Sequence, residues 1–364
     1  MQPTKQPLPT EKKQGQINVL LTGASGTVGS EVLKQLIDKK DIHLTVFDIK
    51  SPKSERIFKP YLSKANFVYG DISNSSNTDK IAKNQDVVIH LAAIIPPLAD
   101  DNPSLAYRVN VVGTKNLISA LKKHSPNAFL MYSSSVSVYG DRVTNPNIRV
   151  GDPLKPSLGD EYARTKLECE RIIQRSNLNW TIFRLAAIMG NHKISKLMFH
   201  MPLATTMEIC TPPDTARAFV NGIGKEKELT GKIFNLGGGL QCTTTFGEFL
   251  QRSFHLYGLG ELNFAENTFA TTNFHCGYYA DGDELEEITR FRKDTLDDYF
   301  EKTKTDISPV TKFFATVFRY PVKKYLQSLS EPRQAIKTKN RPMIERFFGK
   351  SDKSASSIID SFKT

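Results

Sequence analysis

Cysteine is scarce in this 364-residue sequence, and the four that are present form no CxxC pair. Zinc sites and disulfide frameworks need closely spaced thiols, so Cys169, Cys210, Cys242 and Cys276 are expected to be reduced and buried. His275 and Cys276 are adjacent, but two neighbours without further spaced ligands make a poor metal site. The sequence therefore predicts no metal site.

A long hydrophobic run is also lacking. No stretch approaches the roughly 18 consecutive apolar residues that a membrane-spanning helix needs. Residues 1–16 are polar and contain no apolar signal-peptide core. These absences predict a cytoplasmic protein with a disordered leader at 1–16.

Positive charge is sparse in the body of the chain and concentrated near its end. Residues 303–364 contain thirteen Lys and Arg against five Asp and Glu, which gives +8 of the net +11. A protein that follows a nucleic-acid backbone would carry its positive charge on the folded domain. We therefore expect no nucleic-acid partner.

Short apolar runs alternate with helical periodicity along most of the chain. This alternation predicts a parallel sheet with helices on both faces, which is the α/β class with a Rossmann-type doubly wound parallel sheet. The expected strands are 17–21, 43–47, 66–69, 86–91, 129–132, 180–185 and 232–236, and the expected helices are 28–37, 104–121 and 161–173.

The alternation weakens in two stretches, which indicates a small C-terminal substrate-binding lobe beyond the carboxyl ends of the strands. The expected domains are an NAD-binding domain at 17–190 with 214–239 returning to it, the lobe at 191–213 and 240–302, a basic helical extension at 303–350, and a disordered tail at 351–364.

A glycine-rich turn follows the first expected strand and reads TGASGTVG. Gly23 permits the tight exit from the strand, Gly26 lets the backbone approach a pyrophosphate, and Gly29 lets the next helix pack closely. The first N–H groups of that helix would face the phosphates. The turn therefore predicts a dinucleotide site that includes Gly23, Ser25, Gly26, Thr27, Val28 and Gly29.

Carboxylates follow the second and third strands. Asp48 can accept hydrogen bonds from the adenosine ribose and would repel a 2′-phosphate, so NAD is favoured over NADP. A solvated turn aspartate is the alternative for Asp48. Asp71 and Ile72 are expected to contact the adenine.

Tyr162 and Lys166 are one helical turn apart in EYARTK. A neighbouring ammonium lowers the pKa of a phenol, so Tyr162 is a candidate acid and base. The three serines 133–135 end the preceding strand and can orient the same substrate oxygen. Tyr320 and Lys324 repeat the spacing, but Pro321 follows that tyrosine directly and no serine-rich strand precedes it, so we treat the repeat as a chance match.

These motifs, with DVVIHLAA, RVNVVGTKNL, FRLAAIMG, DTARAF and GKIFNLGGG, together resemble the extended short-chain dehydrogenase/reductase family, also called the NAD-dependent epimerase/dehydratase family. The resemblance covers about residues 17–300. It implies catalysis by Ser135, Tyr162 and Lys166, the last two also contacting the cofactor, and a bracing role for Asn110. It also implies cofactor contacts from Leu91, Ala92, Ala93, Leu185, Ala186, Ala187 and Ile188.

The sequence departs from the pattern of the nucleotide-sugar enzymes in this family. Ser134 and Ser135 occupy the place of the Asp-Glu pair of dehydratases, and Arg184 is not followed by the aromatic-Asn pair that is usual in epimerases. A smaller or more apolar alcohol, ketone or sugar derivative is therefore expected, against a hydrophobic wall at 94–97. Hydride transfer with net redox change is the expected reaction, and epimerisation or a non-catalytic NAD(P)-sensing role is the alternative.

The basic extension carries an apolar helical stripe. Its residues are Val310, Phe313, Phe314, Val317, Phe318, Val322, Tyr325, Leu326 and Leu329, and Pro321 is expected to kink the helix. The stripe can dock on the enzyme itself, on a second copy in a homodimer, or on an anionic membrane surface as a peripheral contact. The sequence leaves these three partners open.

Overall fold

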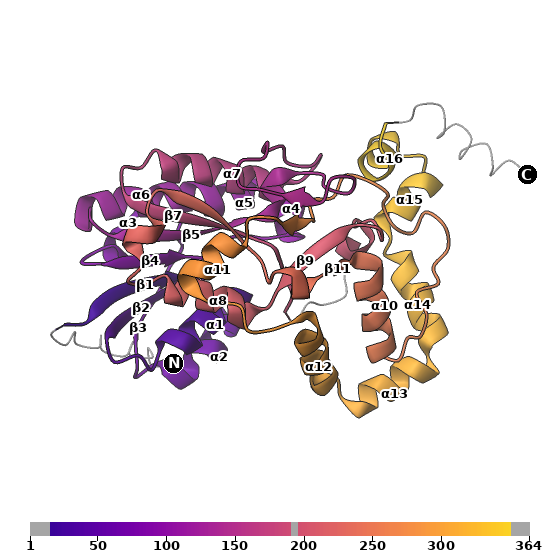
Figure 1. The fold of residues 1–364 in the computed structure, drawn as a ribbon, viewed down its shortest axis with the longest axis horizontal. Coiled ribbons are helices and arrows are strands. Elements are labelled where there is room, and N and C mark those ends of the chain that lie inside the picture. The colour runs from indigo at the N-terminus through magenta and orange to yellow at the C-terminus, as the bar shows by residue number, and fades with distance from the viewer. Residues whose placement is uncertain (1–14, 191–195, 351–364) are drawn as a thin grey trace, which may run out of the picture.

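The computed structural model describes residues 15–190 and 196–350. Most of the predicted disordered leader and all of the predicted tail at 351–364 lie outside the described residues. The molecule consists of a large domain built on a seven-stranded parallel sheet and of a smaller lobe beside it (Figure 1).

The strand order of the large sheet is β10-β7-β5-β4-β1-β2-β3, and every pair is parallel. The strand order reverses between β1 and β4, and ligands of such sheets bind beyond the carboxyl ends of the strands at this point. The predicted fold class is confirmed. The strands are β1 Ile17–Thr22, β2 Ile42–Asp48, β3 Asn66–Tyr69, β4 Val87–His90, β5 Phe129–Ser135, β7 Asn179–Leu185 and β10 Lys232–Leu236.

Both faces of the sheet are covered by helices, which explains the continuous apolar runs of its strands. In Figure 1, α1 (Thr27–Leu36) and α8 (Pro212–Asn221) lie on one face, and α6 (Gly113–His124) and α7 (Glu161–Gln174) on the other. Val19, Leu20 and Leu21 of β1 are successive residues with no exposed surface. The shorter helices are α2 Pro52–Phe58, α3 Ser75–Ile81, α4 Leu98–Asp101, α9 Glu226–Leu229 and α11 Asp283–Thr289.

The long helix predicted at 104–121 has an irregular centre. It runs from α5 (Pro103–Ala106) through a π-helical stretch, Tyr107–Val112, into α6. Wide turns of this kind occur often at functional sites. The stretch contains Asn110, whose side chain faces the loop after β4.

The smaller lobe has its own sheet and core. Its sheet contains β8 (Ala187–Ile188), β9 (Thr206–Cys210) and β11 (Thr243–Thr245), and α10 (Phe246–Leu256) and α12 (Leu296–Asp306) pack beside it. A further strand pair, β6 (Asn147–Ile148) with β12 (Tyr278–Tyr279), joins the lobe to the large domain. Because α12 ends at Asp306, the predicted boundary at 302/303 falls inside a helix.

Four helices make up the extension: α13 (Pro309–Val317), α14 (Arg319–Ser328), α15 (Glu331–Lys337) and α16 (Arg341–Phe348). The kink predicted at Pro321 is a break three residues earlier, at Phe318, whose φ is −100° and ψ 24°. Pro321 lies in the first turn of α14, where a missing N–H costs no helical hydrogen bond. Within 15–190 and 196–350, no helix has the length and apolar character needed to cross a bilayer.

Candidate functional site

The carboxyl ends of the parallel strands bring the predicted site residues to one edge of the sheet. Gly23 has φ +76°, which favours glycine, and a Cβ there would lie 2.6 Å from the main-chain nitrogen of Ala92. Gly26 precedes α1 and provides no side-chain cap, so the first N–H groups of α1 keep their capacity for a ligand. The turn therefore presents main-chain N–H groups without obstructing side chains, as the binding of a pyrophosphate requires.

Asp48 lies at the end of β2 and is held against the glycine turn. Its Oδ2 accepts a hydrogen bond from the Ser25 N–H at 2.7 Å, and its Oδ1 accepts one from the Ile49 N–H at 2.7 Å. Each carboxylate oxygen has a second lone pair, so both can still accept a ribose hydroxyl. The contact also gives Ser25 a role, because its main chain links the turn to Asp48.

The remaining predicted cofactor residues differ in which of their groups is available for a contact. Asp71 is exposed, and its Oδ1 accepts from the N–H and the hydroxyl of Ser73, both at 2.8 Å. The side chain of Ile72 is buried in the core against Gly113, which leaves its main chain for an adenine contact. The other predicted contacts follow β4, end or follow β7, or form β8, and are Leu91, Ala92, Ala93, Leu185, Ala186, Ala187 and Ile188.

Ser135 and Tyr162 lie together beside these strand ends. Ser135 ends β5 and Tyr162 lies in the first turn of α7, close enough for the Ser135 hydroxyl to lower the pKa of Tyr162. Asp160 caps α7, since its Oδ1 accepts from the Ala163 N–H at 2.8 Å. The cap fixes the turn that carries Tyr162.

Lys166 is buried one turn further along α7, and its environment differs from the predicted one. Its ammonium donates to the Ser133 carbonyl at 2.6 Å and lies 4.7 Å from the ring centre of Tyr132. Burial lowers the Lys166 pKa to about 8. Burial, followed by the Asp160 charge, raises the pKa of Tyr162. In the protein alone, desolvation therefore outweighs the pKa-lowering effect that the motif predicts for Lys166.

A buried ion pair, which the sequence analysis missed, supports this arrangement. Glu170 accepts two hydrogen bonds from Arg184, at 3.0 and 2.7 Å, and both side chains are at most 2% exposed. The Ser134 hydroxyl donates to the same carboxylate at 2.5 Å. The sequence signal for this pair was a glutamate on the apolar face of α7, one helical turn after Lys166.

Asn110 connects the loop after β4 to α7. Its amide donates to the Ile94 carbonyl at 3.0 Å and to the Thr165 hydroxyl at 2.9 Å, while its Oδ1 accepts from the Ile94 N–H at 2.7 Å. The resemblance implies that Asn110 braces the sheet from the long helix, and these contacts are with the loop after β4 and with α7. The wide π-helical turn brings the amide to the loop.

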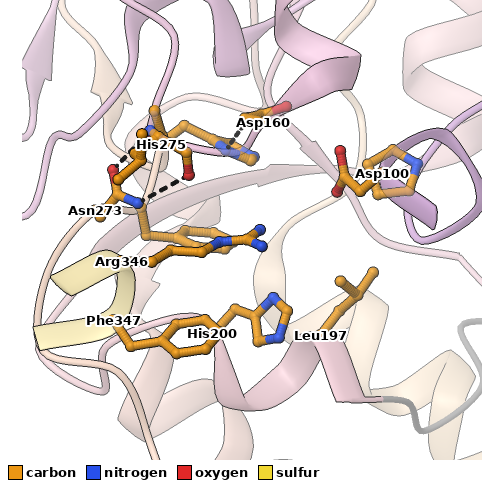
Figure 2. A pocket seen from close by; sticks show the side chains of 12 residues that line it. Asp100, Asp160, Leu197, His200, Asn273, His275, Arg346 and Phe347 are labelled. Atoms are coloured by element: carbon orange, nitrogen blue, oxygen red, sulfur yellow. Dashed lines mark hydrogen bonds and ion pairs between the residues drawn. The ribbon is translucent and has the colours of Figure 1, made fainter. Parts of the chain in front are cut away.

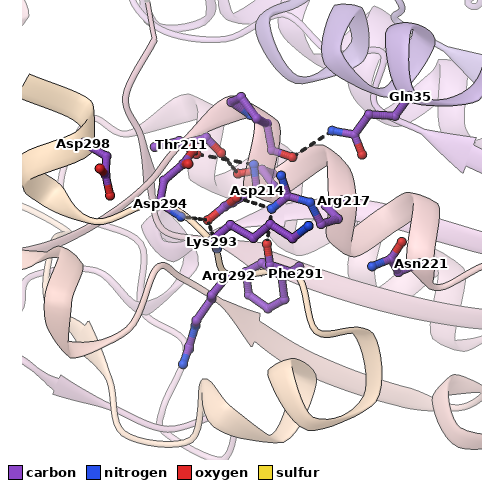
Figure 3. A network of polar contacts seen from close by, with 12 residues as sticks. Gln35, Thr211, Asp214, Arg217, Asn221, Phe291, Arg292, Lys293, Asp294 and Asp298 are labelled. Carbon is purple, nitrogen blue, oxygen red and sulfur yellow. Dashed lines mark hydrogen bonds and ion pairs between the residues drawn. The ribbon is translucent and has the colours of Figure 1, made fainter. Parts of the chain in front are cut away.

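A second polar network joins the large domain to the small lobe (Figure 3). Asp214, at the start of α8, accepts from the N–H groups of Lys293 and Asp294 at 2.7 and 2.9 Å. Its other oxygen is paired with Arg217. The DTARAF motif therefore fixes the segment that leads from α11 into α12.

His275 and Cys276, considered above as metal ligands, have other surroundings. His275 Nδ1 lies 3.0 Å from Asp160 Oδ2, and Cys276 is buried in the core of the small lobe. Burial raises the pKa of Cys276 to about 12, so its thiol is protonated.

The sheet topology and the glycine turn together define a Rossmann-type dinucleotide-binding domain. The NAD dependent epimerase/dehydratase family model matches residues 19–211, and the chain belongs to this family. The resemblance inferred from the motifs is thereby confirmed.

Relatives in this family include epimerases and dehydrogenases. CDP-paratose 2-epimerase from Salmonella typhi is 33% identical over 131 residues, which are 34% of this chain and 38% of that protein. D-erythronate dehydrogenase from Haemophilus influenzae is 24% identical over 163 residues, 43% of this chain and 49% of that protein. The chain thus spans half or less of the length of these two relatives.

Solved structures share the fold. UDP-glucuronic acid 4-epimerase from Bacillus cereus, in complex with UDP-glucuronic acid and NAD, superposes with a TM-score of 0.65 at 20% identity. The match covers 79% of this chain and 98% of that one. DesIV, a dTDP-glucose 4,6-dehydratase from Streptomyces venezuelae with NAD bound, gives a TM-score of 0.66 at 21% identity, with 79% and 95% covered.

Proposed function

We propose that this chain is an NAD-dependent oxidoreductase of the extended short-chain dehydrogenase/reductase type. The observation that carries the proposal is the meeting of Ser135, Tyr162 and Lys166 at the strand ends that also hold the glycine turn. Family membership and the NAD-bound structural neighbours support the cofactor. The substrate class is a small alcohol, ketone or sugar derivative.

The residues present fit NAD. The main chain of the glycine turn would take the pyrophosphate, and Asp48 would take the adenosine ribose, where its charge disfavours the 2′-phosphate of NADP. Bound NAD supplies the hydride acceptor or donor. Lys166, one helical turn from Tyr162, would hold the nicotinamide ribose.

Tyr162 exchanges the proton and Ser135 positions the substrate oxygen. The raised pKa keeps the Tyr162 hydroxyl protonated in the protein alone, so it is ready to donate a proton to a substrate carbonyl during reduction. During oxidation Tyr162 must first give up its own proton to the solvent, so that the phenolate can take the proton of the substrate alcohol. The Ser135 hydroxyl acts on the pKa of the phenol, and the same hydroxyl can bond the reacting oxygen.

Tyr162→Phe tests this assignment. We expect kcat to fall by about 10²–10⁴-fold, the usual contribution of an acid or base, while NAD affinity is retained. Absorbance near 340 nm, followed over a panel of alcohols, ketones and sugar derivatives with NAD and NADP, measures the reaction. The matched control is Tyr320→Phe in the second YxxxK, because Tyr320 is 76% exposed and should leave turnover unchanged.

Two outcomes would redirect the assignment. Product formation by the wild type without a net absorbance change indicates epimerisation, which the name of the CDP-paratose 2-epimerase relative favours as the second candidate. Undiminished turnover in Tyr162→Phe contradicts the assignment of Tyr162 as acid and base.

We also propose a peripheral contact between the extension and an anionic membrane. The stripe is divided: Val322, Leu326 and Leu329 pack into a core with Phe254 and Leu259, whereas its other end is turned to solvent. That end forms the aromatic patch, whose members are 51–64% exposed: Val310, Phe313, Phe314, Val317 and Phe318.

Charge complementarity supports a lipid surface as the partner of this patch. Lys312, Arg319 and Lys324 are exposed around it, and each basic residue near an anionic bilayer contributes about 1 kcal/mol. Apolar faces bordered by lysine and arginine are typical of interfacial helices. Co-sedimentation with vesicles tests the contact.

A further inference from the structure

A cavity of about 150 Å³ lies between the two halves of the molecule, beside the start of α7 (Figure 2). Asp100, Ser157 and Asp160 line it from the large domain, and His200 and His275 from the small lobe. Asp160, which lines the cavity, caps α7 two residues before Tyr162. The Asp160 charge helps to raise the pKa of that tyrosine. It therefore adjoins the proposed reaction centre.

The extension supplies the cationic side of this cavity. Arg346, in α16, points its guanidinium into the cavity, between His275 and His200 in Figure 2. A Cβ on Gly159 would lie 3.1 Å from the Arg346 Cζ, so the arginine reaches the loop that precedes α7. Among the described residues, Arg346 forms no ion pair within 4 Å, although its charge acts on Asp100 and its guanidinium lies 5.4 Å from the ring centre of Phe347.

α16 is anchored, so Arg346 has a defined position. Phe347 is 2% exposed, and its ring centre lies 4.8 Å from that of His200. The Phe347 carbonyl accepts from the Thr271 N–H at 2.9 Å. Glu331, in α15, binds His200 at 2.6 Å and Lys196 at 3.2 Å. These contacts hold the extension against the small lobe on both sides of the cavity.

The acidic groups of the cavity already have partners at the start of α7. Asp100 Oδ1 accepts from the Glu161 N–H at 3.1 Å, and Asp160 caps the helix and faces His275. Burial, and then the Asp160 charge, nevertheless raises the pKa of Asp100. Ser157 is 6% exposed and lines the cavity. Within residues 15–190 and 196–350, its hydroxyl has no hydrogen-bond partner, and neither has Asp160 Oδ2 apart from its ion-pair contact with His275.

We propose that this cavity binds the anionic group, a carboxylate or a phosphate, of the small molecule on which the enzyme acts. Arg346 would bind the two anionic oxygens with its planar fork, and Ser157 would donate a further hydrogen bond. The extension would thus complete a substrate subsite contributed otherwise by both lobes. The link to a substrate rests on the proposed function, whereas the anion site itself does not.

Mapped arginine modification tests the site in the full wild-type chain. The protein is treated with phenylglyoxal in sodium chloride, oxalate or phosphate at equal ionic strength, and labelling of each arginine is followed by mass spectrometry. We expect oxalate, phosphate or both to slow labelling of Arg346 several-fold, with Arg341, exposed on the same helix, and Arg333 as references. Slowing by oxalate alone identifies a carboxylate site, and slowing by phosphate alone a phosphate site.

Equal labelling of Arg346 in all three salts, or equal slowing at Arg341 and Arg333, overturns the proposal. NAD binding is measured on the same preparation by a thermal shift. Protection of Arg346 without NAD binding would defeat the proposed function and leave the anion site standing. NAD binding without protection of Arg346 would defeat the anion site and leave the proposed function standing.

Substitutions then connect the site to turnover of the anionic substrate found in the 340 nm panel. Arg346→Ala should raise KM about tenfold or more, because a hydrogen bond to a charged group is lost, while kcat changes little. Arg346→Lys should recover part of this loss, and Arg341→Ala should behave as wild type. A KM unchanged in Arg346→Ala, with the fold intact by thermal melting, contradicts the proposal.

Discussion

His90 shows how a single buried residue links the site to the sheet. Its Nδ1 lies 2.8 Å from the Thr22 hydroxyl and its Nε2 3.0 Å from the Thr114 hydroxyl, so the ring connects β4 with β1 and α6. Burial, and then the Lys166 charge, lowers its pKa to about 3. The imidazole is therefore neutral throughout the physiological range, and both ring nitrogens have hydroxyl partners.

This burial predicts a loss of stability in mild acid. As the pH falls below about 6.5, the unfolded chain binds a proton at His90 that the folded chain refuses until about pH 3. Between pH 7 and 5 this linkage costs about 2 kcal/mol of unfolding free energy. Urea unfolding at both pH values should show that His90→Gln lacks this part of the pH dependence.

His255→Gln is the matched control, because its side chain is 54% exposed and it should keep the wild-type difference between the two pH values. A wild-type pH dependence in His90→Gln would show that His90 is not the responsible group. The sequence places His90 at the end of a buried strand, but its two hydroxyl partners come from segments distant in sequence.

At the scale of the element, α7 carries most of the proposed reaction centre. Asp160 caps it, and Tyr162, Lys166 and Glu170 follow at one-turn intervals on its inner face. The Tyr-Lys spacing predicts the first two functional residues. The role of Glu170 depends on Arg184 of β7, which only the packing of α7 on the sheet brings into contact.

Glu170→Gln should destabilise the protein by about 3 kcal/mol, because the Arg184 guanidinium would stay buried without a counter-charge. Urea unfolding at neutral pH measures the loss. Glu168→Gln, on the same helix with a side chain 40% exposed, should change the unfolding free energy by less than about 1 kcal/mol. Equal losses in the two variants would mean that the buried pair contributes nothing specific.

At the scale of the whole molecule, the extension has two faces. α16 closes the cavity beside α7, whereas α13 lies at the outer edge of the small lobe, away from the large sheet (Figure 1). One segment thus contributes to the proposed substrate subsite and presents the aromatic patch. Membrane contact through α13 would leave the strand ends that hold the proposed site free.

The full chain should co-sediment with phosphatidylcholine vesicles that contain phosphatidylserine, less with phosphatidylcholine alone, and less at high salt. Replacing Phe313, Phe314 and Phe318 together by serine should abolish the binding without unfolding the protein, since all three rings are more than half exposed. Leu240→Ser, which removes an 89% exposed side chain outside the patch, is the control.

Retained vesicle binding in the triple variant would contradict the membrane contact. A wild type that is dimeric, binds no vesicle and becomes monomeric in the triple variant would assign the patch to a second copy. Light scattering of the same samples separates these outcomes.

The sequence by itself determined the sheet and the glycine turn, because each depends on local periodicity or on residues a few positions apart. It also predicted the proposed Ser-Tyr-Lys set, from the Tyr-Lys spacing on one helix and the serines at the end of the preceding strand. The tertiary structure decided what depends on distant partners. It turned Lys166 toward Ser133, paired Glu170 with Arg184, and divided the apolar stripe between a core and the solvent. It also brought Arg346 to Gly159, across nearly two hundred residues of chain. Desolvation and ion pairing arise only when such segments meet, so they follow from packing and not from sequence spacing.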